Sequence, residues 1–362
     1  GQSDNRTMQP TQAKSPKKGT KGSGKPQVRR RLSVMPGSIS VESEAKLDGI
    51  AIGEDEAKAT EMATGAFAKG GVVKEFTSLS RVGYVPFNNR KVNQDRYTEH
   101  PMFAGEKTKS LFGVFDGHGV HGHDVSQFLI THLPTLIAKG KNLEKHPHAQ
   151  ITRSFLAANA KLDKSGIDTT CSGTTAVVCY INGTRIYTCN SGDSRAIVAT
   201  LQDGKIIAKG LSIDQKPELE SERKRILENN GRVQACQDLD GNPVGPMRVW
   251  LKHQDIPGLA MTRSFGDKLA ASVGVTCKPE ILEYDLKEGV DQFLVLGSDG
   301  IWEFISNQEA ADIVAAESTA KAAAKALVEE ATARWKKEEE VIDDITATIV
   351  YLKGSKYPAM SK

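Results

Sequence analysis

Short runs of apolar residues, separated by glycine and asparagine, fill the chain from about Phe76 onward. Six of these runs are four to eight residues long, and several are rich in β-branched side chains, a pattern typical of strands buried on both faces. They cover residues 111–115, 174–181, 185–189, 196–199, 292–297 and 345–352. The Asn182-Gly183 pair between two runs predicts a hairpin, because both residues readily adopt the positive φ of a tight turn.

Other segments repeat apolar residues every three or four positions, as an amphipathic helix does. In residues 125–138, for example, Val125, Leu129 and Leu133 share one face. The other predicted helices cover residues 150–164, 217–229, 307–316 and 320–337. Clustered strands interrupted by pairs of helices, without strict strand–helix alternation, favour an α+β sandwich over a Rossmann-type sheet.

Two segments lack a sustained apolar period. Residues 1–74 are rich in Lys, Ser, Gly, Gln and Pro and almost free of aromatics, which predicts a disordered tail before a folded domain at 75–353. A short C-terminal tail at 354–362 follows this domain. Residues 234–258 contain many turn-forming residues and are predicted to form a long functional loop.

Charge is distributed unevenly along the 362 residues. Residues 1–40 hold nine basic groups and one acid, and their charge of +8 leaves −5 for the remainder of a chain whose net charge is +3. A solvated basic tail is the favoured interpretation, although Lys17-Lys18 and Arg29-Arg30-Arg31 also fit a bipartite nuclear-import spacing. We therefore expect a cytoplasmic or nuclear location. Ser33, after the three arginines, resembles a site for an arginine-directed kinase.

Composition excludes several classes of protein. Five cysteines, with no C-x-x-C pair, argue against a disulfide scaffold or a structural zinc site and favour a reducing compartment. No stretch approaches 18 apolar residues, and no apolar core follows the N-terminal charges, so we expect neither a membrane span nor a secretory signal. Aromatic residues are not interleaved with the basic ones, so no nucleic-acid partner is expected, and the chain is expected to be a monomer.

Aspartates recur where the predicted strands begin or end. They lie in the segments DGHG at 116–119, NSGD at 190–193, SDG at 298–300 and DD at 343–344, with NQD at 93–95 before a further apolar run. Glycine beside a fixed strand end permits an ion to approach closely, and Mg²⁺ and Mn²⁺ prefer oxygen ligands. Each segment alone is also a common turn, so only the set as a whole predicts a metal site.

Seven segments together resemble the motif series of the type 2C, metal-dependent serine/threonine protein phosphatases. In chain order they are RKVNQD (90–95), FGVFDGHG (112–119), SGTTA (172–176), NSGDSRA (190–196), LAMTRSFGD (259–267), SDGIWE (298–303) and DDIT (343–346). They occur in the order of the family and lie within a region of about 76–353. The resemblance implies an α+β, four-layer sandwich of two antiparallel β-sheets flanked by α-helices, which agrees with the periodicity.

The resemblance also implies a ligand set for two Mg²⁺ or Mn²⁺ ions. Asp116 would bridge both ions, and the carbonyl of Gly117 would complete one site together with Gln94, which acts through bound water. Asp299 and Asp343 would bind the other ion. A hydroxide activated by the two ions would then hydrolyse phosphoserine or phosphothreonine on a protein without a phosphoenzyme intermediate.

Four further residues match positions with supporting roles in the family. Asp95 would support the metal ligands from behind, and Asp193 would bind a weaker third ion that shares Asp299. Arg90 resembles the arginine that grips the substrate phosphate, for which a planar guanidinium is well suited. His118 resembles the histidine proposed as the general acid that protonates the leaving alkoxide.

Three positions depart from the family pattern. Gln94 stands where many members have glutamate, which removes one negative charge near a metal. Glu303 replaces an aspartate of the third site and puts that site in doubt. Asp344, where an asparagine is usual, adds charge near the first site.

The leading hypothesis is an active phosphatase that acts on phosphoproteins. The alternative from another class is a catalytically silent relative used as a binding or regulatory module, which should have lost ligands such as Asp116, Asp299 and Asp343. A hydrolase of small phosphate esters is a third hypothesis. The 234–258 segment falls where the family has a variable flap, and we expect it to influence substrate choice. Within it, Trp250 either contacts a partner or anchors the segment.

Overall fold

The computed structural model describes residues 61–66 and 70–357. Three features of the predicted N-terminal tail lie outside these residues, namely Lys17-Lys18, Arg29-Arg30-Arg31 and the kinase site at Ser33. Residues 358–362 of the predicted C-terminal tail also lie outside them. No helix in the part of the chain that is described is long and apolar enough to cross a membrane.

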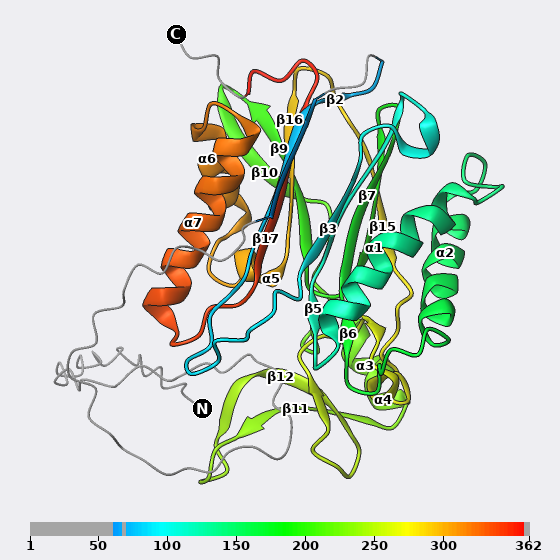
Figure 1. Ribbon diagram of the computed structural model, residues 1–362, viewed down its shortest axis with the longest axis vertical. Coiled ribbons are helices and arrows are strands. Elements are labelled where there is room, and N and C mark those ends of the chain that lie inside the picture. The colour runs from blue at the N-terminus through cyan, green and yellow to red at the C-terminus, as the bar shows by residue number, and fades with distance from the viewer. Residues whose placement is uncertain (1–60, 67–69, 358–362) are drawn as a thin grey trace, which may run out of the picture.

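Two antiparallel sheets lie face to face in the centre of the molecule (Figure 1). Neighbouring strands of the six-stranded sheet are, in order, β1 (Glu61–Ala66), β2 (Val73–Arg81), β17 (Ile345–Leu352), β16 (Asp291–Gly297), β9 (Arg195–Gln202) and β10 (Lys205–Gly210). Those of the five-stranded sheet are β15 (Glu280–Asp285), β8 (Arg185–Ser191), β7 (Ala176–Asn182), β4 (Lys109–Phe115) and β3 (Arg96–His100).

The alternation of side chains along each strand divides the interior into layers. On β16, Leu294 and Leu296 point into the core between the two sheets, whereas Phe293 and Val295 point to the outer face. On β4 of the opposite sheet, Phe112 belongs to the same central core. Both faces of these strands are therefore buried, which explains why they appear in the sequence as nearly continuous apolar runs.

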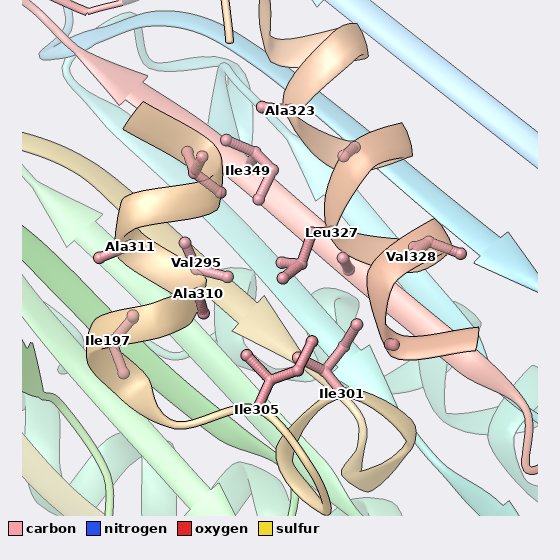
Figure 2. Close-up of a cluster of buried hydrophobic side chains, with 14 of the residues drawn as sticks. Ile197, Val295, Ile301, Ile305, Ala310, Ala311, Ala323, Leu327, Val328 and Ile349 are labelled. Atoms are coloured by element: carbon pink, nitrogen blue, oxygen red, sulfur yellow. The ribbon is translucent and has the colours of Figure 1, made fainter. Parts of the chain in front are cut away.

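Helices cover the outer face of each sheet (Figure 1). The helices α6 (Asn307–Ala316) and α7 (Ala320–Glu338) pack on the six-stranded sheet, and Figure 2 shows Ala310 and Leu327 of these helices facing Val295 and Ile349 of the strands. The helices α1 (Gly122–Ala138) and α2 (Pro147–Leu162) pack on the other sheet, where a 3-10 turn, η1 (Phe103–Gly105), also contributes to the core.

The predicted fold class is confirmed. Helices α6 and α7 and strand β17 occupy the predicted ranges to within a residue, and the Asn182-Gly183 hairpin joins β7 to β8. Strand β1 differs from the expectation of a disordered tail at 1–74, because it pairs along its whole length with β2. Backbone pairing of this kind satisfies the hydrogen bonds of β2 without requiring an apolar pattern in β1.

The prediction of a long loop at 234–258 is wrong. This segment belongs to a three-stranded sheet of β11 (Gly231–Gln237), β12 (Pro243–Leu251) and β13 (Pro257–Leu259), next to α3 (Glu220–Glu228) and α4 (Lys268–Ala271). Register shifts interrupt the alternation of side chains, one of them between Ala235 and Cys236, so the period-2 pattern is lost from the sequence. We call residues 231–259 the flap.

Candidate metal centre and active site

Five aspartates lie at strand ends on one end of the sandwich. Asp116 follows β4, Asp193 lies between β8 and β9, and Asp95 precedes β3. Asp299 follows β16 as the first residue of a short helix, α5 (Asp299–Trp302), and Asp343 lies just before β17. The strands belong to both sheets, and the five carboxylates lie close enough together for the charges of the other four to act on Asp116. Helix α5, which begins with Asp299, is labelled in Figure 1.

The charges of these aspartates act on one another. Burial raises the pKa of Asp116 well above its usual value, and the charges of Asp95, Asp299, Asp343 and Asp193 raise it further. Burial also raises the pKa of Asp343, and the charges of Asp299 and then Asp344 raise it further. Mutual repulsion of this kind is relieved when cations bind between the carboxylates.

Asp95 carries the clearest sign of an incomplete environment. Its Oδ2 accepts a hydrogen bond from Ser298 Oγ at 2.7 Å, whereas its buried Oδ1 has no hydrogen-bond partner of good geometry among the described residues. Burial, followed by the charge of Asp344, raises the pKa of Asp95 to about 7. The residues thus fit hard divalent cations in their chemistry, although no group of three His, Cys, Asp or Glu side chains in residues 61–66 and 70–357 is already arranged to hold an ion.

Asp116 and Gly117 are positioned by a small sheet of β14 (Phe265–Gly266), β6 (Gly173–Thr174) and β5 (Gly117–His118). The N–H of Asp116 donates to Thr175 Oγ1 at 3.0 Å, and the N–H of Thr175 donates back to the Asp116 carbonyl at 2.9 Å. A Cβ on Gly117 would lie 2.6 Å from the carbonyl oxygen of Gln94. Only glycine fits at this position.

Gln94 is held by hydrogen bonds from both its backbone and its side chain. Its backbone N–H donates to Asp344 Oδ2 at 2.8 Å, and its side-chain Nε2 donates to the carbonyl of Gly119 at 2.7 Å. The amide side chain therefore lies beside the DGHG segment, where the resemblance expects it to act on a metal-bound water. A glutamate could not donate the hydrogen bond to Gly119.

Asp344 links the two segments that carry Asp343 and Arg90. Its Oδ1 accepts from Lys91 Nζ at 2.5 Å and from the N–H of Gly83 at 2.7 Å, while Oδ2 accepts from the N–H of Gln94. These contacts give Asp344 a structural role in addition to the added charge that the sequence suggests. Arg90 itself is exposed, and its N–H donates to Asn88 Oδ1.

His118 is held by a residue to which the sequence assigns no role. Its Nε2 lies 2.7 Å from Asp267 Oδ2, and Asp267 is fully buried. Burial alone would lower the pKa of His118, but the charge and the hydrogen bond of Asp267 outweigh burial and raise it. Gly173 makes this pair possible, because a Cβ there would lie 2.1 Å from Asp267 Oδ2.

Asp193, the expected ligand of a third ion, is engaged by a cation of the chain itself. Lys216 Nζ lies 2.7 Å from Asp193 Oδ2, and the side chain of Asp193 is only 1% exposed. A third ion would therefore have to compete with this ammonium group. Glu303, the unusual residue of that site, follows α5 directly, and its N–H donates to the Asp299 carbonyl one turn earlier.

The flap is a small antiparallel sheet in which β12 pairs with both β11 and β13. Its Trp250 is buried, and its Nε1 donates to the carbonyl of Gln234 at 2.8 Å. The guanidinium of Arg232 lies 5.7 Å from the centre of the ring, and Gly258 leaves space for the ring because a Cβ there would be 2.7 Å away. Of the two interpretations of Trp250, the structure supports an anchor for the flap.

Sequence reasoning overlooked Lys91, Lys216 and Asp267 as parts of the site. Asp267 belongs to a quoted motif, so a systematic search for partners of His118 would have considered it. Lys91 and Asp344 are separated by 253 positions, and nothing in the local sequence indicates that they form an ion pair.

Comparison with known proteins agrees with this geometry. The sequence model of the family described as "Protein phosphatase 2C" matches residues 87–339. "Probable protein phosphatase 2C 64" of Oryza sativa subsp. japonica is 40% identical over 282 residues, covering 75% of this chain and 65% of the rice protein. "Probable protein phosphatase 2C 35" of Arabidopsis thaliana is 34% identical, covering 77% of this chain and 84% of that relative.

A solved structure shows the same fold. The crystal structure of serine-threonine phosphatase 2C from Toxoplasma gondii aligns with a TM-score of 0.68 and 19% identity, covering 82% of this chain and all of that one. An identity this low supports the fold alone, whereas the family match extends over most of the chain. From its motifs, its fold and these relatives, the chain belongs to the protein phosphatase 2C family.

Proposed function

We propose that this chain is a metal-dependent protein phosphatase that removes phosphate from phosphoserine and phosphothreonine in protein substrates. Family membership supports the reaction class. The observation that carries the proposal for this chain is the carboxylate Asp116, whose pKa is raised by burial and then by the charges of four other aspartates. Such a cluster favours cation binding over a purely structural role.

Two Mg²⁺ or Mn²⁺ ions would be held by the carboxylates of Asp116, Asp299 and Asp343 and by the carbonyl of Gly117. Gln94 would contact one of these ions through water. When bound, these ions would supply an acidified water and neutralise charge on the phosphoryl group. The proposal comprises two ions, because a third ion at Asp193 would have to displace Lys216.

The remaining steps belong to side chains of the protein. The exposed guanidinium of Arg90 offers a planar pair of donors to the phosphate oxygens. His118, held by Asp267, donates a proton to the departing serine or threonine oxygen. The phosphoryl group passes to water without a phosphoenzyme intermediate in this proposal.

Phosphate release from a phosphothreonine peptide tests the proposal, with Mn²⁺ and then with excess chelator. We expect release that requires the metal and that exceeds release from a matched phosphotyrosine peptide. A folded protein that releases phosphate from no peptide, but still binds phosphopeptides, would instead favour the silent regulatory module. Release from small esters alone would favour the third hypothesis, a hydrolase of small substrates.

A further inference from the structure

The segment between Gly83 and Gln94 is a turn-rich loop that is fixed at both ends. At its start, the N–H of Tyr84 donates to the Ile342 carbonyl at 2.7 Å, and the N–H of Ile342 donates back at 2.8 Å. At its far end, the side chain of Lys91 and the N–H of Gln94 donate to Asp344. The loop is therefore attached to the segment that contains Asp343, and it carries Arg90.

Phe87 occupies an unusual position in this loop. Its side chain is fully exposed, with a relative accessibility of 100%, and its φ is +64°. Positive φ is unfavourable for a bulky residue, and a fully exposed phenyl ring gains no burial energy in return. Packing within the described residues therefore does not account for an aromatic side chain at this position.

Two further exposed apolar side chains lie in the loop that carries Phe87 and Arg90. Tyr84 is 55% exposed and Val92 is 52% exposed, and both lie in the same loop. Phe87 and Arg90 are three positions apart, so their Cα atoms are separated by at most about 11 Å, and the turns at Asn88 bring them closer. In an extended peptide, residues two or three positions apart are separated by about 7–11 Å.

We propose that Phe87 is a specificity-determining residue that contacts a large apolar side chain of the substrate, two or three positions from the phosphorylated residue. This inference rests on the proposed function, because it assumes that Arg90 holds the phosphate. The polypeptide substrate would then bind with its phosphate at Arg90 and an apolar neighbour on Phe87. Burial of the two side chains against each other would favour such a substrate by about tenfold in kcat/KM.

The test uses the full chain with Mn²⁺ and a set of phosphothreonine peptides. Each peptide has leucine or serine at one position, from three before to three after the phosphothreonine. The selectivity is the ratio of kcat/KM for the leucine peptide to that for the serine peptide, and each rate is normalised to p-nitrophenyl phosphate hydrolysis by the same variant. We expect a ratio of about ten at one position two or three residues from the phosphothreonine.

Variants then assign the preference to the ring. Phe87→Ala should reduce the ratio to about one, whereas Phe87→Tyr should retain most of it because the ring remains. Leu156→Ala, which removes an exposed apolar side chain on α2, is the matched control and should keep the wild-type ratio. A wild-type ratio near one at every position, or a ratio that survives in Phe87→Ala, would overturn the inference alone. Failure of the folded wild type to hydrolyse p-nitrophenyl phosphate or any peptide would overturn the proposed function, and this inference with it.

Discussion

The ammonium group of Lys91 donates to the carboxylate of Asp344 across 2.5 Å, and this pair joins the two segments that bear Arg90 and Asp343. The Asp344 side chain is only 5% exposed, so the pair is shielded from solvent. Arg90, the proposed phosphate-binding residue, directly precedes Lys91 in the sequence. Asp343, a proposed metal ligand, directly precedes Asp344. The pair is thus one of the contacts that hold the loop carrying Arg90 against the segment carrying Asp343.

Replacement of Lys91 by methionine should therefore weaken both stability and activity. It leaves the buried carboxylate of Asp344 with backbone donors only, and loss of one charged hydrogen bond should lower the free energy of unfolding by about 2–3 kcal/mol. Without the pair, the loop is less well fixed, and we expect kcat/KM for a phosphopeptide to fall at least about fivefold. Urea denaturation and steady-state kinetics measure the two effects, with exposed Lys321→Met as the control. Unchanged values for Lys91→Met would contradict this role of the pair.

The Asp95→Asn variant should be more stable than the wild type when metal is absent. Because the folded-state pKa of Asp95 is raised from 3.8 to about 7, its contribution to stability is lost as the pH rises through this range. In chelator at about pH 8, we expect the melting temperature of Asp95→Asn to exceed that of the wild type by about 3 °C or more, and the difference to shrink toward about pH 4.

Calorimetry across this pH range, with and without Mn²⁺, provides the measurement. Added Mn²⁺ should stabilise the wild type more than Asp95→Asn, because the carboxylate favours the cation. An Asp95→Asn protein that is less stable than the wild type in chelator at about pH 8 would show that the aspartate is satisfied without metal.

Asp267→Asn should slow hydrolysis to a degree that depends on the leaving group of the substrate. A threonine alkoxide is strongly basic and needs a proton from His118, whereas p-nitrophenolate leaves readily without one. We expect kcat for a phosphothreonine peptide to fall by about tenfold or more, and kcat for p-nitrophenyl phosphate to fall less than about threefold. Asparagine retains an oxygen that can accept from Ser264, so the fold should persist. Equal losses on both substrates would indicate that Asp267 only supports the structure.

Glu222 lies on α3, beside the flap, and should make the stability of the protein depend on pH in the acid range. Burial opposes its ionisation, but hydrogen bonds from Arg225 and Arg263 outweigh burial and lower the pKa of Glu222 from 4.5 to about 2. A lowered folded-state pKa stabilises the protein above the unfolded value, and this contribution is lost as the pH falls from about 4.5 to 2.

Denaturation of the wild type and Glu222→Gln measures this contribution. The free energies of unfolding should differ by about 3 kcal/mol at pH 7, and the difference should decrease below about pH 4.5. A difference that stays constant down to about pH 3 would mean that hydrogen bonding without charge accounts for the contribution of Glu222.

The buried part of the fold could be predicted from the sequence because its strands and helices have strong local patterns of apolar residues. The eight residues of β17 form one apolar run with both faces covered, and the prediction coincides with the strand. Strands of the flap were not predicted, because register shifts and exposed polar positions remove the alternation. Strand β1 was missed because pairing with β2, rather than its own composition, makes it a strand.

In the site, too, features with a local sequence pattern could be predicted, and features set by packing could not. The aspartates could be predicted because strand ends and glycines mark their positions locally. The pairs that position the neighbouring site residues leave no local signal, since Lys91–Asp344 and His118–Asp267 join residues 253 and 149 positions apart. Whether Asp193 would face a metal or a lysine also depended on packing, which places Lys216 against it.

The most direct test of the central claim compares the wild type with Asp299→Ala in one assay. Phosphate release from a phosphothreonine peptide and Mn²⁺ binding by calorimetry are measured on the same folded samples. We predict that the wild type requires Mn²⁺, and that Asp299→Ala loses at least one bound ion and more than about 100-fold in kcat/KM. Release that persists in excess chelator, or an Asp299→Ala variant with wild-type activity and metal binding, would contradict the assignment of these aspartates as the catalytic metal centre.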